Sequence, residues 1–322
     1  GPRPRRHRPP SEPRTARCRA WTLAGRHIGH GCGRPLASSG VAAALALLSA
    51  LLFGAADFFG GTAARRTHVL VVVAASHLIG LALILAVAPA IAETVSGRDL
   101  AYGALAGLFG LLGIGLLYHC LSRGPMAVVA PITAISNFAL PVLWGVAFGE
   151  RLSAVNVVGV LLGLVAITLV SRGPNTGGVA SPTRVPTTLL LEALLAGVGF
   201  AGFYIVMAAT AEASFPWPLV SARVVAVGVA LLLLVRVGRS PIPRRAEGGT
   251  AIVMAGLLDM IANLAILAAI HRGLLSLMVV LASLYPATTV ILARTVLDER
   301  MSRSQVVGLF GALAAVACIV GG

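Results

Sequence analysis

Eight polar side chains interrupt long apolar stretches of this sequence, and their chemistry needs an explanation. An ionisable group at membrane depth costs about 2.5–3.5 kcal/mol on insertion scales. We therefore expect such residues to persist where they bind a solute, carry a proton or pair with one another. The eight candidates for substrate binding or ion coupling are Asp57, His77, Asn137, Tyr204, Arg223, Asp259, Asn263 and Tyr285.

Asp259 and Asn263 are four residues apart, so on a helix they share one face. This face is expected either to line a cavity or to form a structural hydrogen bond with a neighbouring helix. A buried Arg223 has two options as well. It can neutralise Asp259, Asp57 or Glu192, or it can receive the carboxylate of a substrate through its planar guanidinium.

Asp57 and His77 are candidates for coupling transport to an ion. An imidazole titrates near neutral pH, so His77 could relay protons. For His77 the simpler alternative, which we favour slightly, is a side chain that reaches the membrane interface. For Asp57 the alternative is a carboxylate near a helix end that reaches interfacial water, Arg65 or Arg66.

Prolines mark a second kind of candidate site. A proline inside a helix leaves the carbonyl four residues earlier without its donor and bends the helix, which exposes acceptors to water or to a solute. We expect helix kinks at Pro131, Pro141 and Pro286, although kinks are also common in membrane bundles. Together with Asn137, Tyr204 and Tyr285, these positions are the predicted central site.

Motifs for chemistry at a cofactor or metal are absent from the sequence. There is no GxSxG or GxxxxGK[ST] motif, and no His, Asp and Glu set has the spacing of metal ligands. We therefore predict no enzyme activity, no metal and no cofactor.

The elements that must position these residues follow from composition. Of the 322 residues, 57% are hydrophobic and 11% are charged, with a mean hydropathy of +0.92. A segment of about 20 apolar residues crosses the bilayer as a helix, because every backbone polar group must be satisfied within the segment. The sequence predicts an all-α integral membrane protein with ten transmembrane helices, near 41–63, 69–92, 101–121, 126–148, 155–171, 187–209, 217–237, 250–270, 274–296 and 304–321.

The basic residues lie in a tail and in short loops. The net charge is +14, and residues 1–39 are rich in Arg and Pro with almost no aliphatic run, so we predict a disordered tail there. No folded basic face remains, which excludes nucleic acid as the expected partner. The expected partners are the lipid bilayer and a small-molecule solute. The oligomeric state stays open between monomer and homodimer.

An internal repeat is the clearest pattern in the chain. At an offset of 149 residues, Arg123-Gly124 recurs as Arg272-Gly273 and Glu150-Arg151 recurs as Glu299-Arg300. Each copy holds five predicted spans, and an odd number of crossings inserts the second copy the opposite way. We therefore predict two inverted five-helix repeats, at 40–171 and 187–322, joined by a linker at 172–186 that is rich in Gly, Pro, Ser and Thr. Inverted repeats are typical of secondary transporters that bind their substrate near the bilayer midplane.

Both halves resemble the EamA-like branch of the drug/metabolite transporter superfamily. The resemblance rests on LLFGAADFFGG and on GER at 149–151 and DER at 298–300, each followed by a polar turn and a Gly-containing last helix. It implies a bacterial inner-membrane exporter of a metabolite, amino acid or drug-like solute, with cytoplasmic termini. The Arg-rich tail favours the same orientation, whereas the short loops, eleven Arg against three, favour the reverse. The competing interpretation is a membrane scaffold that transports nothing.

Overall fold

The computed structural model describes residues 36–91, 94–123, 126–170, 186–240, 248–297 and 302–321. Nearly all of the predicted tail and linker therefore lies outside the described residues. The first helix begins at Leu36, four residues inside the range predicted as tail, and the second half begins with a helix at Thr187.

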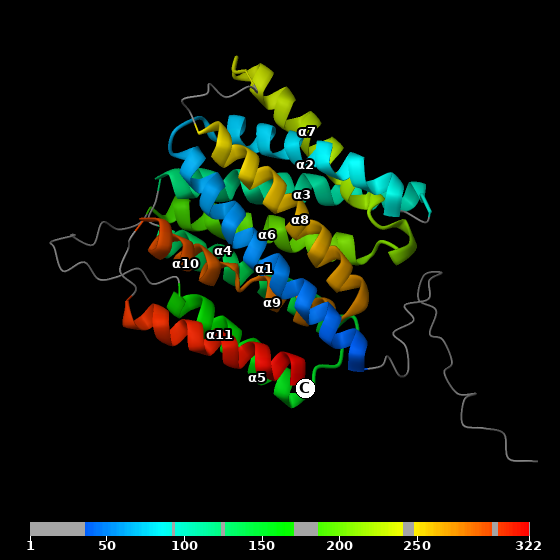
Figure 1. Cartoon of the computed structure of the whole chain (residues 1–322), viewed down its shortest axis with the longest axis vertical. Helices are drawn as coiled ribbons and strands as arrows, with labels where there is room; N and C mark the ends of the chain where they lie inside the picture. The colour runs from blue at the N-terminus through cyan, green and yellow to red at the C-terminus, as the bar shows by residue number, and fades with distance from the viewer. Residues whose placement is uncertain are drawn as a thin grey trace, which may run out of the picture. The chain divides into compact units, whose positions relative to one another are not determined.

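All the regular elements among the described residues are helical. Each of the ten predicted ranges holds one helix, except 274–296, which holds two (Figure 1). The helices are α1 (Leu36–Ala64), α2 (Val69–Ile91), α3 (Gly97–Arg123), α4 (Met126–Ala147), α5 (Ala154–Val170), α6 (Thr187–Ala208), α7 (Trp217–Arg236), α8 (Gly249–Arg272), α9 (Leu275–Ala282), α10 (Tyr285–Leu297) and α11 (Arg303–Gly321), with a short 3-10 turn, η1 (Glu212–Ser214), before α7.

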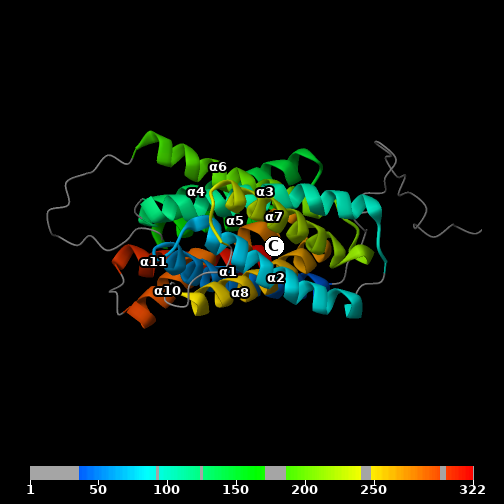
Figure 2. The ribbon, with the colours of Figure 1, turned by 90° about the horizontal axis from the view of Figure 1, so that it is seen from above.

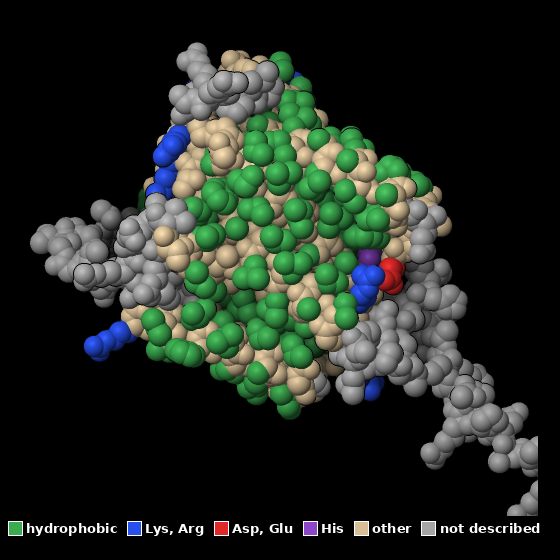
Figure 3. All heavy atoms as spheres, viewed as in Figure 1, with side chains coloured by type: hydrophobic (Ala, Val, Ile, Leu, Met, Phe, Trp, Pro, Cys, Tyr) green, Lys and Arg blue, Asp and Glu red, His purple; other side chains and the backbone are tan. Residues whose placement is uncertain are grey.

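Length and composition suit these helices to a bilayer. Among the described residues, seven helices are long and apolar enough to cross a membrane, and three further apolar helical stretches are shorter, at Ile132–Ala147, Ala154–Leu169 and Leu275–Thr288. Large apolar side chains such as Leu85, Leu161 and Leu313 point outward. On the face in Figure 3, green apolar side chains cover the middle and charged ones lie at the margins. Such a surface matches lipid, since soluble proteins rarely expose apolar patches of this extent.

The two halves of the chain interlock rather than lie apart. The first helix of each half packs along the third helix of the other, α1 on α8 and α6 on α3. The last helices, α5 and α11, pack on each other at one edge of the bundle (Figure 1). Turned by 90°, the bundle shows α3, α4 and α6 in one layer and α1, α8 and α10 in another (Figure 2). Each half therefore completes the core of the other.

Glycines allow these cross-half contacts to be close. A Cβ on Gly199 of α6 would collide with the backbone of Phe109 and Gly113 in α3. A Cβ on Gly107 of α3 would meet the backbone of Ala222 in α7 in the same way. Small residues permit this approach, and membrane helices gain van der Waals contact from it.

The range 274–296 is broken into α9 and α10 at Ser283 and Leu284. Pro286 stands just after the break, so its missing N–H coincides with the start of a new helix rather than a bend within one. The corresponding helix of the first half, α4, runs unbroken through Pro131 and Pro141. The two halves therefore differ in this element, although their sequences align.

Glu150 fixes the beginning of α9. Its carboxylate accepts hydrogen bonds from the backbone N–H groups of Leu275, at 2.8 Å, and Ser276, at 3.1 Å, and from the Ser276 hydroxyl. A carboxylate in this place satisfies free N–H groups and complements the positive end of the helix dipole. The loop after α4 is thereby tied to the second half of the chain.

The contact at Gly199 can be tested by one added methyl group. We expect Gly199→Ala to lower the free energy of unfolding by about 1–3 kcal/mol, because both facing groups are backbone and cannot move aside independently. Thermal unfolding of the purified protein in detergent measures the change. The control is Gly228→Ala in α7, where a Cβ meets nothing within 4 Å. Equal stability of the two variants would contradict the close contact.

Candidate binding pocket

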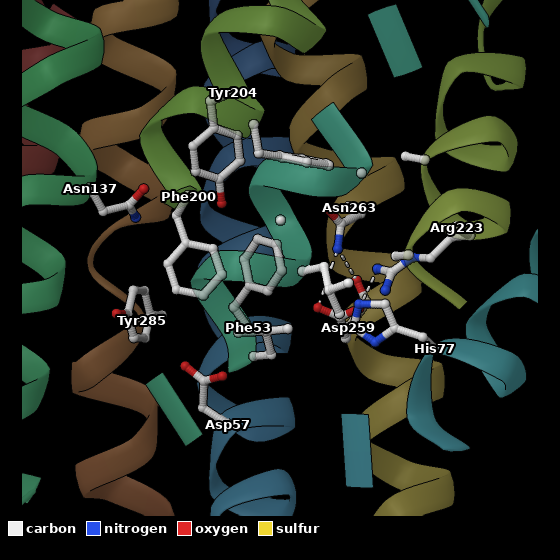
Figure 4. A pocket seen from close by; sticks show the side chains of 17 residues that line it. Phe53, Asp57, His77, Asn137, Phe200, Tyr204, Arg223, Asp259, Asn263 and Tyr285 are labelled. Atoms are coloured by element: carbon white, nitrogen blue, oxygen red, sulfur yellow. Dashed lines mark hydrogen bonds and ion pairs between the residues drawn. The ribbon is translucent and has the colours of Figure 1, made fainter. Parts of the chain in front are cut away.

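A pocket near the middle of the helices collects all eight predicted site residues. Seventeen residues from α1, α2, α3, α4, α6, α7, α8 and α10 line it (Figure 4). The space between them measures about 670 Å³, the part open to solvent included. Small molecules bind in concave pockets that apolar side chains line together with a few polar groups, as in this pocket. The structure thus brings the eight residues together, and their roles in binding and coupling remain proposals.

The equivalent positions of the two halves contribute differently to the pocket. Asp259 and Asn263 of α8 line it, and so do Gly110 and Ile114, which precede them by 149 residues in α3. One half therefore supplies polar groups where the other supplies space or an apolar wall. A single asymmetric pocket results from two similar halves.

Arg223 of α7 neutralises Asp259. Its guanidinium donates a hydrogen bond to the Asp259 carboxylate, and the two side chains form an ion pair. Both residues line the pocket, and the Arg223 side chain is 8% exposed whereas that of Asp259 is 24% exposed. Of the options that the sequence left open for Arg223, the structure shows this pairing.

Asn263 holds Asp259 from its own helix. The Asn263 side-chain amide donates to the Asp259 backbone carbonyl at 2.7 Å and to the Asp259 carboxylate at 3.3 Å. The spacing of four residues makes both contacts possible. The carboxylate is therefore fixed by α7 and α8 before any solute arrives.

His77 lies in the pocket wall, close to Arg223 in Figure 4. It is 7% exposed and stands well inside α2, so the alternative of an imidazole reaching the interface is wrong. Its Nδ1 has no hydrogen-bond partner among the described residues. Interfacial exposure failed as an explanation because helix packing, which a single sequence does not reveal, buries this turn of α2.

Asp57 of α1 occupies a different part of the pocket from the ion pair. Figure 4 shows it beside Phe53 and below Tyr285, with Asp259 and Arg223 further along the cavity. No hydrogen bond or ion pair joins Asp57 to another described residue, Arg65 and Arg66 included. An ionised Asp57 therefore has no compensating charge in contact with it.

Asn137 connects the pocket to the break between α9 and α10. Its side-chain amide donates to the Ser283 hydroxyl at 3.4 Å. Its Oδ1 is buried without a partner among the described residues, and the residue is only 3% exposed. A buried acceptor left open is costly, so this oxygen is available to a donor that enters the pocket.

Aromatic residues form a share of the wall that sequence reasoning missed. Phe53, Phe200 and Phe203 line the pocket beside the predicted Tyr204 and Tyr285. Apolar rings in a membrane helix give no signal that separates pocket from core. One cue was present, since Phe53 lies four residues before Asp57 and so shares its helix face.

The other predicted features fall outside this wall. Pro141 and Pro286 do not line the pocket, and the Pro131 side chain lies outside what the structure describes. In the part of the chain that the structure describes, no group of three His, Cys, Asp or Glu residues could hold a metal ion.

The chain matches a family model and several solved structures. The model described as the EamA-like transporter family matches residues 40–172 and again residues 187–321. A crystal structure described simply as "protein" is 20% identical, with a TM-score of 0.69, and covers 86% of this chain and 95% of its own. That likeness shows the fold alone. No curated protein matches the chain.

The ion pair can be tested by a double-mutant cycle. We expect Asp259→Asn alone to lower the free energy of unfolding by roughly 3 kcal/mol, because it leaves the buried Arg223 charge uncompensated. Arg223→Met combined with Asp259→Asn should cost less than the sum of the two single changes. Thermal unfolding of all four proteins gives the coupling energy, and strictly additive effects would show that the pair is not formed.

Proposed function

This chain belongs to the EamA-like transporter family, and we propose that it carries a small organic solute across the membrane by alternating access between two inverted repeats. The observation that carries this proposal is the pocket. It lies near the middle of the helices, is lined by both halves and holds ionisable groups. Secondary transporters with inverted repeats bind their substrates in this position.

The proposed topology has ten crossings. In it α1 to α8 and α11 each cross once, and α9 with α10 crosses once as a broken helix. Five crossings per half insert the second half the opposite way. Inversion supports alternating access, because two similar halves can exchange roles and give inward-open and outward-open states of similar energy.

The finer points of the proposal concern direction, coupling and orientation. We propose export of a metabolite, amino acid or drug-like solute from a bacterial cell, through the inner membrane. Asp57 or His77 would couple this movement to protons, since both line the pocket. The termini would be cytoplasmic, as the Arg-rich tail favours, although the short loops alone favour the reverse.

Alternating access predicts that a pocket position becomes reachable from both sides of the membrane. We expect Ala226→Cys, a small change in the pocket wall, to react with a small membrane-impermeant thiol reagent in both right-side-out and inverted vesicles. The background is the full chain with its native thiols replaced, at Cys18, Cys32, Cys120 and Cys318. Mass spectrometry of the purified protein measures the extent of labelling.

Two further cysteines control this experiment. Ala166→Cys, fully buried away from the pocket, should stay unlabelled from either side. Gly40→Cys, exposed near the beginning of α1, should react in inverted vesicles only if the amino-terminal end of α1 is cytoplasmic. Labelling of Ala226→Cys from one side alone, or from neither, would contradict alternating access.

Transport itself predicts solute release from proteoliposomes. Vesicles that contain the protein and a defined mixture of amino acids, amines and carboxylic acids should lose some of these solutes faster than protein-free vesicles. If Asp57 carries the coupling proton, an imposed pH gradient should change the rate for the wild type but not for Asp57→Asn. Mass spectrometry of the external solution gives the rates. A scaffold would release nothing above the protein-free control.

A further inference from the structure

From the charges at one end of the bundle, we infer that the chain binds the headgroups of anionic phospholipids at a cluster of four arginines. These are Arg65 and Arg66, in the turn between α1 and α2, and Arg236 and Arg239, at the end of α7. The site lies outside the pocket, and the inference does not depend on the proposed transport function. Three observations carry it: the fixed positions of the arginines, their lack of ion pairs, and the apolar helix surface beside them.

The turn between α1 and α2 holds two of the arginines at the surface. Within this turn the backbone N–H of Arg66 donates to the carbonyl of Ala63 at 2.9 Å, and the N–H of Leu70 donates to His68 Nδ1 at 3.3 Å. Arg65 and Arg66 are both exposed. Two neighbouring guanidinium groups are therefore carried by a turn whose backbone is fixed by hydrogen bonds.

The end of α7 brings the other two arginines to the same end of the bundle. Val72, near the beginning of α2, and Leu234, near the end of α7, belong to one buried cluster, so these two packed helices run in opposite directions. After Arg236, Gly238 takes a positive φ of 67°, and the N–H of Arg239 donates back to the Leu234 carbonyl at 3.0 Å. This is a common way for a helix to end, and it keeps Arg239 close to α7.

The arginines of α7 act on the turn between α1 and α2. Partial burial, and after it the positive charge of Arg239, lowers the pKa of His68, which stands two residues after Arg66. Exposed charges interact over only about 8 Å at physiological ionic strength. The two pairs of arginines therefore form one basic cluster rather than two separate ones.

The positive charge of this cluster is not balanced within the protein. No ion pair joins any of the four arginines to another described residue. The described acids outside the pocket contact other groups: Asp99 the Ser214 hydroxyl, Glu150 the beginning of α9, Glu192 the His119 imidazole and Glu212 the Arg272 guanidinium. Like charges on one surface repel each other, so a bound anion stabilises the cluster. The planar guanidinium matches the oxygens of a phosphate in particular.

The position of the cluster favours a lipid over a soluble anion. The apolar spans that α1, α2 and α7 form end or begin next to these arginines, which places them at the depth of the lipid headgroups. Val235 is 76% exposed and Leu232 is 55% exposed, so acyl chains can pack along α7 beside Arg236. Figure 3 shows blue side chains at the margin where α1 meets α2 in Figure 1, with green apolar side chains beside them. Basic clusters at the end of a span are typical of anionic-lipid recognition.

The test compares lipids that share their acyl chains but differ in headgroup charge. Dioleoylphosphatidylglycerol, dioleoylphosphatidylcholine and the soluble headgroup analogue glycerol phosphate are each titrated into the purified full chain in a nonionic detergent. The shift in unfolding temperature gives the affinity, because a ligand that binds only the folded protein stabilises it. The anionic lipid should bind about tenfold or more tightly than the zwitterionic lipid and than glycerol phosphate, and added salt should weaken its binding.

Variants assign this binding to the cluster. Arg65→Gln combined with Arg66→Gln should lower the affinity for phosphatidylglycerol by about fivefold for each arginine replaced. Arg65→Lys combined with Arg66→Lys keeps the charge and should lose less. The matched control, Arg151→Gln combined with Arg272→Gln, removes the same charge from exposed arginines outside the cluster and should bind the lipid as the wild type does.

A second pair of substitutions repeats the test from α7. Arg236→Gln combined with Arg239→Gln should lower the affinity in the same way, and it decides the question if the first pair does not fold. Equal binding of the two lipids would overturn the inference, as would glycerol phosphate that binds as tightly as the anionic lipid. An unchanged affinity in the cluster variants, or an equal loss in the control, would do the same. The transport proposal is unaffected by these results, since the proteoliposome assay tests it separately.

Discussion

The structure depends on one constraint, which is that polar groups surrounded by lipid must find their partners inside the protein. Helices satisfy this condition for the backbone, and all regular elements among the described residues are helical. For side chains, the same constraint favours ionisable residues that lie in the interior of the bundle, where they can contact one another. Asp259 meets Arg223 there, and Asn263 completes the contact. In the pocket some polar groups lack partners among the described residues, such as Asn137 Oδ1 and His77 Nδ1.

Much of the fold could be predicted because hydropathy and the repeat act over many residues. The ten apolar ranges match the helices, and the family model matches once in each half. The break between α9 and α10 could not be read in the same way, because α4 contains two prolines and stays continuous. What distinguishes them is tertiary: Asn137 of α4 donates to Ser283 at the break. A single sequence holds no record of that contact.

For the site, residue type indicated which side chains would gather but not how they would pair. Asp57, His77 and Asp259 are polar residues within apolar runs, and all three line one pocket. The sequence left three acids as possible partners of Arg223, because the arrangement of the helices in space decides which acid it contacts. The phenylalanines of the pocket could not be predicted, because in the sequence a ring that lines a pocket cannot be distinguished from a ring that packs in the core.

The glycine contacts described for α3, α6 and α7 have a consequence for variation in this chain. Where a glycine touches the backbone of another helix, as at Gly199 and Gly107, every other amino acid brings at least one atom too many. A pocket side chain outside the Asp259–Arg223 ion pair can change without disturbing these contacts, so the specificity of the pocket can vary there. The glycine contacts between the halves do not tolerate an added side chain. At these contacts the architecture is held by residues that have no side chain at all.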